Sequence, residues 1–117
     1  MAYDEELAER IRELLAERPD VTQKRMFGGL AFLVGGHMTI SASGQGGALV
    51  RVDPAATSSL VAGGAAEIAV MRGRPMEGWL RVSSENLRTR RQLSRWVGRA
   101  VAWVETLPPK KQAARFS

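Results

Sequence analysis

A chain of 117 residues, 44% hydrophobic and 25% charged, has the size and composition of one globular domain with a single core. It contains no cysteine, which excludes disulfides and cysteine-based metal or redox chemistry. Its N-terminus is acidic, and no apolar run approaches the roughly 18 residues that a membrane span needs. We therefore expect a cytoplasmic protein with no membrane contact.

The net charge of +5 is unevenly distributed along the chain. Residues 1–18 carry six acids and three arginines, whereas residues 72–117 carry eleven bases and three acids. A basic third of this kind can attract nucleic acid or an acidic partner. A solvated arginine face, which GC-rich coding also produces, is the commoner explanation of such a composition.

The first predicted element is an amphipathic helix over residues 4–18. Its apolar residues follow the i, i+4, i+7, i+8 pattern of one helical face: Leu7, Ile11, Leu14 and Leu15. Asp4 and the two glutamates after it complement the positive end of the helix dipole. Pro19 stops the helix because the residue before proline is disfavoured in the helical region.

The central stretch, residues 24–43, holds two Gly-Gly pairs and the only histidine. The pair Gly28-Gly29 interrupts the alternation of the apolar residues, which predicts a bulge in one bent strand or a backbone that another group approaches closely. The pair Gly35-Gly36 predicts a hairpin turn into a second strand over residues 37–42. A third strand is predicted over residues 48–52, after the glycine-rich turn at 44–47.

The second half begins with Asp53-Pro54, a helix-entry signature for a short helix through Val61. Strands are predicted over residues 67–71 and 79–82, followed by a long helix capped by Ser83 or Ser84 and stopped by Pro108-Pro109. The order helix, three strands, helix, two strands, helix predicts a two-layer α+β domain in which helices cover one face of a mostly antiparallel sheet. We assign residues 1–109 to this single domain and residues 110–117 to a basic tail.

The sequence offers little support for a catalytic, metal-binding or cofactor-binding site. His37 titrates near neutrality, but no metal-ligand spacing or nucleophile-elbow motif accompanies it. The glycine pairs match neither the dinucleotide fingerprint nor the phosphate loop, and turn geometry explains them. We therefore expect no catalytic, metal-binding or cofactor-binding residue. A Ser-His-Asp arrangement formed by the tertiary structure stays open at this stage.

The basic residues predict a contact surface, because arginine is suited to bidentate contacts with phosphates and carboxylates. On a helical wheel Arg88, Arg95 and Arg99 fall within about 40° of one another, with Arg91 on the flank. The predicted contact surface comprises Lys24, Arg25, Arg72, Arg74, Arg88, Arg91, Arg95 and Arg99. A solvated face is the alternative, since no aromatic residues that would stack on bases are interleaved with these arginines.

Several segments together resemble a known family. They are Arg-Met-Phe-Gly-Gly at 25–29, Leu-Val-Arg-Val-Asp at 49–53, Gly-Arg-Pro-Met at 73–76 and the strand at 79–82. The chain resembles, over nearly its whole length, the N-terminal domain of the TfoX/Sxy family of bacterial competence regulators, here as a stand-alone domain. The resemblance implies the same order of elements in a secretion-chaperone-like fold that often dimerises.

Full-length members of that family are associated with transcriptional activation of DNA-uptake genes, as coactivators acting with another regulator, and carry a second, helical domain. The resemblance brings no catalytic or cofactor residues to this chain. It therefore implies a non-enzymatic regulatory or interaction module, with a protein partner, nucleic acid as a further candidate partner, and a homodimer. The alternative is a small enzyme or ligand-binding protein with a pocket beside Gly28-Gly29 and His37.

Overall fold

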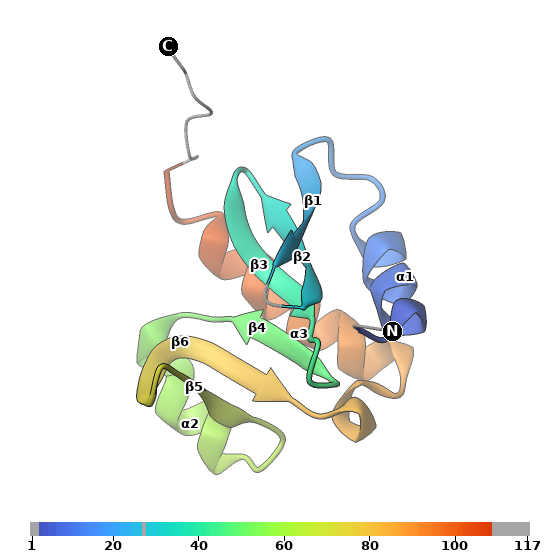
Figure 1. Cartoon of the computed structure of the whole chain (residues 1–117). Coiled ribbons are helices and arrows are strands. Elements are labelled where there is room, and N and C mark those ends of the chain that lie inside the picture. The colour runs from blue at the N-terminus through green and yellow to red at the C-terminus, as the bar shows by residue number, and fades with distance from the viewer. Residues whose placement is uncertain (1–2, 27, 109–117) are drawn as a thin grey trace.

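The computed structural model describes residues 3–26 and 28–108 of the chain. Figure 1 shows its elements. In chain order they are helix α1 (Glu5–Leu14), strands β1 (Val21–Met26), β2 (Gly29–Val34), β3 (His37–Ala42) and β4 (Ala48–Arg51), helix α2 (Thr57–Ala62), strands β5 (Glu67–Met71) and β6 (Arg74–Val82), and helix α3 (Arg90–Val104). Short 3-10 helices, Pro54–Ala56 and Ser84–Leu87, precede α2 and α3. The predicted tail, residues 110–117, lies outside the described residues.

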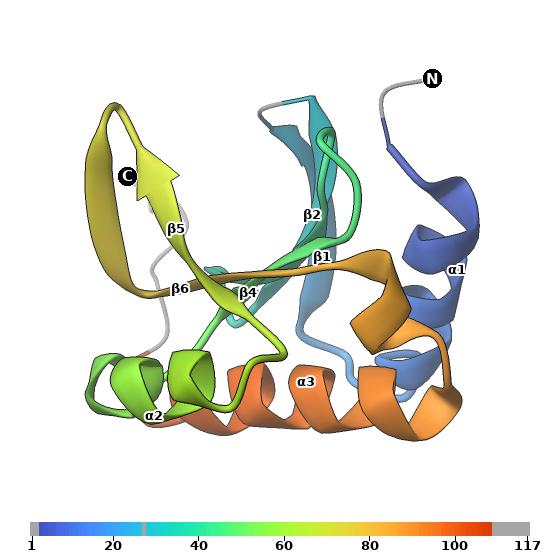
Figure 2. The ribbon, with the colours of Figure 1, turned by 90° about the horizontal axis from the view of Figure 1, so that it is seen from below.

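The strands form one six-stranded antiparallel sheet in the order β1-β2-β3-β4-β6-β5. Helix α3 packs across β3 and β4, α1 packs beside α3, and α2 packs against β5 and β6. Figure 2 shows α2 and α3 together on one side of the sheet. The predicted α+β class is thus confirmed. The opposite face of the sheet, which we call the open face, is covered by none of the helices in the described residues.

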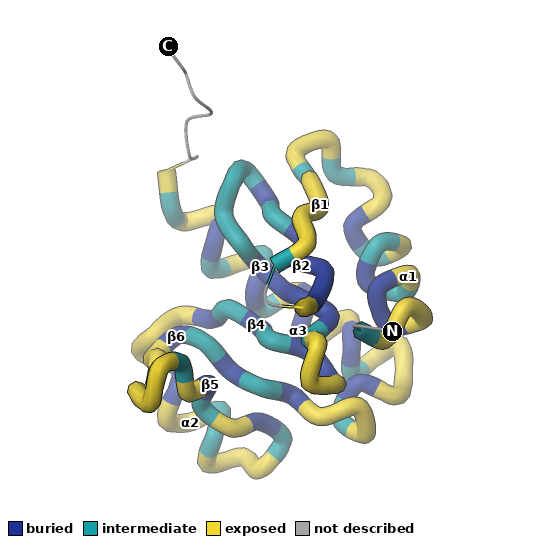
Figure 3. The backbone as a smooth tube through the Cα atoms, viewed as in Figure 1, coloured by how far each residue is buried: buried dark blue, intermediate teal, exposed yellow. Residues whose placement is uncertain are grey.

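The core lies between the sheet and the helices. The cross-strand partners Phe32, Ile40, Val50 and Leu80 form a row across β2, β3, β4 and β6, and each is fully buried. They belong to one cluster with Ile11 of α1 and the buried side of α3 (Figure 3). Burial of each such side chain contributes about 1.5–3 kcal/mol, which orients the sheet with this row toward the helices.

The glycine pair at 28–29 does not bend one strand, as the sequence predicted, but separates two. Strand β1 pairs with β2 from Val21↔Val34 to Met26↔Gly29, so the chain reverses direction between the two strands. Gly28 has φ of +76°, and a Cβ on Gly29 would overlap the carbonyl oxygen of Ala42. The strand was missed because its middle residues are all polar and exposed, which removes the alternation that identifies a strand.

The last helix begins later than predicted. Thr89, not Ser83 or Ser84, caps α3: its hydroxyl accepts from Gln92 N at 3.0 Å, and the Gln92 side chain accepts from Thr89 N at 2.9 Å. This reciprocal capping box satisfies two N–H groups that a helix start leaves free. The helix also ends at Val104, before the two prolines.

Candidate functional site: a groove on the open face of the sheet

Strand β6 changes direction at Gly78. The β5–β6 ladder jumps there from Ile68↔Leu80 to Ala69↔Met76, and Gly78 has φ of +88°. Its N–H donates to Thr57 Oγ1 at 2.9 Å, and its carbonyl accepts from Val52 N at 2.8 Å. Because the bend is held from both sides, the outer part of the β5–β6 hairpin rises away from the helices (Figure 2).

The raised hairpin forms one wall of a groove of about 1000 Å³ on the open face. Its opposite wall is the turn between β3 and β4. The lining residues are Ser43, Gln45, Leu49, Glu67, Ile68, Ala69, Val70, Met71, Arg72, Arg74, Met76 and Arg81. Val70 and Met76 are 60% and 37% exposed, and they are the large hydrophobic side chains exposed in the described part of the chain. Apolar exposure is therefore concentrated in this groove.

The groove is positively charged. Arg72 and Arg74 are exposed at the hairpin tip, and Arg81 lies on β6 at the floor. Glu67 is the cross-strand partner of Arg81, yet the ion pairs found within residues 3–26 and 28–108 involve only Arg12 and Arg18 as cations. The Arg81 guanidinium is therefore available to a ligand.

A second hollow of about 350 Å³ continues from the groove and shares Gln45, Glu67 and Arg81 with it. Its other lining residues are small or polar: Gly46, Gly47, Gly64, Ala65, Ala66, Val82, Ser83, Ser84 and Asn86. The two hollows together form a trough with an apolar end at the hairpin and a polar end at the turn between β3 and β4. An extended chain would find hydrophobic contacts at one end and hydrogen-bonding groups at the other.

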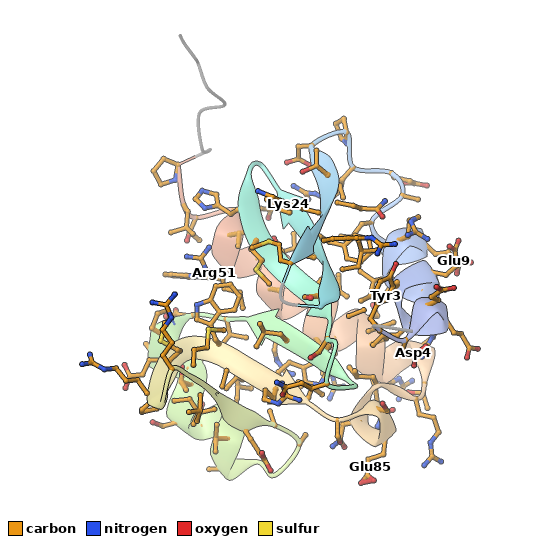
Figure 4. The ribbon with its side chains drawn as sticks, in the orientation of Figure 1. Tyr3, Asp4, Glu9, Lys24, Arg51 and Glu85 are labelled. Atoms are coloured by element: carbon orange, nitrogen blue, oxygen red, sulfur yellow. The ribbon has the colours of Figure 1, made fainter. Side chains whose placement is uncertain are left out.

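An arginine and a tryptophan extend this surface along the open face. Arg51 of β4 and Trp79 of β6 are cross-strand partners, and the guanidinium carbon lies 5.3 Å from the centre of the indole ring. Burial among its neighbours lowers the pKa of Arg51, because a desolvated guanidinium holds its charge less favourably. Arg51 is labelled in Figure 4. This pair is a preformed cation–aromatic contact rather than a free charge.

The predicted contact surface is divided between different parts of the molecule. Lys24, labelled in Figure 4, and Arg25 are exposed on the edge strand β1. Arg72 and Arg74 belong to the groove, whereas Arg91, Arg95 and Arg99 lie on α3, on the other side of the sheet (Figure 2). Arg88 precedes α3 and its carbonyl accepts from Arg10 at 3.1 Å. The hairpin and helix arginines therefore do not form one site.

The structure does not bring Gly28-Gly29 and His37 together, because these residues lie at opposite ends of the β2–β3 hairpin. Gly29 begins β2, while His37 pairs with Val34 at its far end, about 16 Å away at 3.3 Å per residue. His37 Nε2 lies 2.6 Å from the carbonyl oxygen of Pro108, which is a structural hydrogen bond.

Within the described residues, no group of three or more His, Cys, Asp or Glu side chains is arranged to hold a metal ion. None of the helices in residues 3–26 and 28–108 is long and apolar enough to cross a membrane.

Sequence reasoning found Arg72 and Arg74 but missed Val70, Met76 and Arg81. A signal existed, since Ile68, Val70 and Met76 are apolar residues in a segment that also carries the charged residues Glu67, Arg72, Arg74 and Glu77. That pattern does not tell which apolar side chains are covered. The bend at Gly78 determines which of these apolar side chains stay exposed.

The chain matches the model of the TfoX N-terminal domain over residues 13–103, from the last turn of α1 through nearly all of α3. The chain belongs to the TfoX N-terminal domain family. This is not a known enzyme family, which fits a domain without catalytic chemistry. No curated protein and no solved structure matches the chain significantly. The resemblance inferred from the segment at residues 25–29 is thus confirmed at the level of the family.

Proposed function

We propose that this TfoX N-terminal domain is a non-enzymatic regulatory interaction module that binds a protein partner through the groove on its open face. The observation that carries the proposal is the coincidence of three features in one place. They are the exposed hydrophobic side chains of Val70 and Met76, a groove of about 1000 Å³, and the guanidinium of Arg81, which forms no ion pair within the described residues. Exposed hydrophobic residues rimmed by polar ones are typical of protein interaction sites.

The energy available fits a reversible complex. Burying Val70 and Met76 against a partner would contribute about 1.5–3 kcal/mol for each side chain when fully desolvated. Arginines at the rim would mainly direct the encounter and select the partner by charge. A partner-dependent, exchangeable contact is what a regulatory module requires.

The groove proposal can be tested in cells with a photo-crosslinking residue in place of Met76. We expect a discrete crosslinked protein that disappears when Val70→Glu is added, because a charge on the groove wall would oppose apolar docking. The matched control carries the photo-crosslinker in place of Arg95, on α3, and should not yield that protein. Identical products from both positions, or no product from position 76, would refute groove binding.

Nucleic acid binding is a second candidate, and a different observation favours it. Arg91, Arg95 and Arg99 follow one another at four-residue intervals on α3, which places them about 6 Å apart along the helix axis. Among the described residues none of them forms an ion pair with a carboxylate. Burial lowers the pKa of Arg99, and repulsion from the positive charge of Arg95 lowers it further. Such a row suits contacts to successive phosphates.

The dependence of DNA affinity on salt tests this second candidate. We expect duplex DNA to bind with an affinity that falls as salt rises, and the double variant Arg91→Gln/Arg95→Gln to reduce the slope by about 2. The control, Arg72→Asn/Arg74→Gln, removes two charges from the groove and should leave the slope unchanged. Absence of binding at low salt would remove nucleic acid from the proposal. The homodimer stays a prediction, which light scattering at high protein concentration would check.

A further inference from the structure

We propose that the groove takes an extended, acidic and apolar peptide segment that adds as a further strand to the free edge of β5. This inference rests on the proposed groove function and specifies the chemistry and conformation of the segment bound. Three observations support it: the open edge of β5, the apolar side chains beside that edge, and the arginines around it.

The first observation concerns the two edges of the sheet, which differ in their protection. Strand β1 has four exposed polar residues in succession, including Lys24 and Arg25, and charged side chains on an edge discourage pairing with another chain. Strand β5 consists of Glu67, Ile68, Ala69, Val70 and Met71, with β6 on one side only. Its other side therefore presents backbone N–H and C=O groups that pair with no strand in the described part of the chain.

The second observation is that apolar side chains lie beside the open edge. Ile68, Val70 and Met71 of β5 and Met76 of β6 line the groove, and among the described residues Val70 and Met76 are the exposed large hydrophobic ones, Val70 the more so. Strand addition uses backbone hydrogen bonds for affinity and pockets for alternate side chains for specificity. An added strand would place every second side chain against these apolar groups.

The third observation is the charge around the edge. The groove contains three arginines, Arg72, Arg74 and Arg81, and a single acid, Glu67. Arg72 and Arg74 lie at the hairpin end of β5, whereas Arg81 lies opposite Glu67 at the other end. The five residues of β5 span about 13 Å at 3.3 Å per residue step. The complementary segment therefore carries carboxylates near both ends and apolar residues between them, because arginine pairs with carboxylates in bidentate geometry.

The experiment begins with a displayed library of random 12-residue peptides selected on the folded domain. The selected peptides are expected to carry acidic residues on both sides of alternating apolar positions. Their affinity for the domain is then measured by fluorescence polarisation. The variant Arg72→Asn/Arg74→Gln should weaken binding at least tenfold, because two of the three groove cations are lost; asparagine tolerates the positive φ of residue 72. The matched control, Arg91→Gln/Arg95→Gln on α3, should change the affinity by less than twofold.

Backbone pairing has its own readout in amide hydrogen exchange. Binding should protect amides of β5 that exchange quickly in the free domain and leave those of β1, at the other edge of the sheet, unchanged. Thermal melts of each variant separate loss of binding from loss of folding. Protection confined to α3, or to β1, would overturn strand addition to β5.

The outcomes separate this inference from the proposed groove function. Selected peptides that are basic or helical, and whose binding is abolished by Val70→Glu, would overturn the inference while the groove remains a binding site. A stable dimer that protects β5 in the free domain would overturn it in favour of a second copy. Both proposals would be overturned if no peptides are selected, or if the affinity of the selected peptides is unchanged by Val70→Glu and by substitution of the groove arginines.

Discussion

Replacing Gly78 by alanine tests the bend that forms the groove. An L-residue in a left-handed conformation costs about 1–2 kcal/mol, and Gly78 has φ of +88°. A Cβ at this position would also lie 3.2 Å from Pro54 Cγ and 3.2 Å from the carbonyl oxygen of Val52. Both contacts are tighter than an ordinary van der Waals contact, and relieving them must move the backbone that Gly78 hydrogen-bonds.

We expect Gly78→Ala to lower the free energy of unfolding by about 2–4 kcal/mol, the sum of the conformational cost and about 1–2 kcal/mol for the crowded contacts. At roughly 4 °C for each kcal/mol in a domain of this size, Tm should fall by about 8–16 °C. The matched control is Gly64→Ala, because Gly64 has φ of +86° with no atom within 4 Å of the added Cβ. It should cost only the conformational part, about 1–2 kcal/mol.

The assay is urea unfolding followed by tryptophan fluorescence, with Tm from a thermal melt as a second measure. Both variants lose the same glycine flexibility in the unfolded chain, so the difference between them isolates the contacts at the bend. A difference below about 0.5 kcal/mol, or a larger cost for Gly64→Ala, would refute the account of Gly78 as a sterically required bend. A Gly78 variant that folds should also bind groove peptides more weakly.

Two further predictions concern the helices. Thr89→Ala should lower the free energy of unfolding by about 1 kcal/mol because it removes the hydroxyl of the α3 capping box, whereas Thr89→Ser, which keeps a hydroxyl, should retain most of that stability. An unchanged urea midpoint in Thr89→Ala would show that the cap does not contribute. Arg18 Nη1 lies 2.8 Å from Glu105 Oε2, and with 31% and 52% of the two side chains exposed a double-mutant cycle should give a coupling of about 0.2–1 kcal/mol that salt reduces. A coupling energy that rises with salt would contradict an ion pair between Arg18 and Glu105. Hydrogen bonds to Asp20 and Glu105 raise the pKa of Arg18 further above neutrality. The stability that Arg18 contributes is therefore present below its pKa in the unfolded chain and should not change across neutral pH.

Much of the fold could be predicted because local patterns carry it. Helix α1 follows from its apolar spacing and from Asp4, whose Oδ1 accepts from Leu7 N at 3.0 Å. The turn at Gly35-Gly36 has φ values of +59° and +85°, as the glycine pair predicted. Strand β1 escaped prediction because it has no apolar face, and the start of α3 was misplaced because serines, which also begin the 3-10 helix, precede the true cap at Thr89.

The candidate site was predicted in fragments. The sequence indicated which residues are cationic, but the predicted contact surface placed Arg88, Arg95 and Arg99 together with the hairpin arginines. The structure separates them because α3 and the β5–β6 hairpin project from opposite sides of the sheet (Figure 2). Charge can be counted from a sequence, whereas the face on which a charge lies depends on how the elements pack.

The sequence by itself determined the α+β class, the order of its main elements and the family, because these follow from periodicity, turn residues and a few local segments. Only the tertiary structure decided where the groove forms and which side chains line it. The direction of β6 depends on Thr57, 21 residues before Gly78, and on the backbone of Val52. Those long-range hydrogen bonds raise the hairpin, expose Val70 and leave the edge of β5 open. Local sequence patterns cannot predict them, because the residues that form them are far apart in the chain.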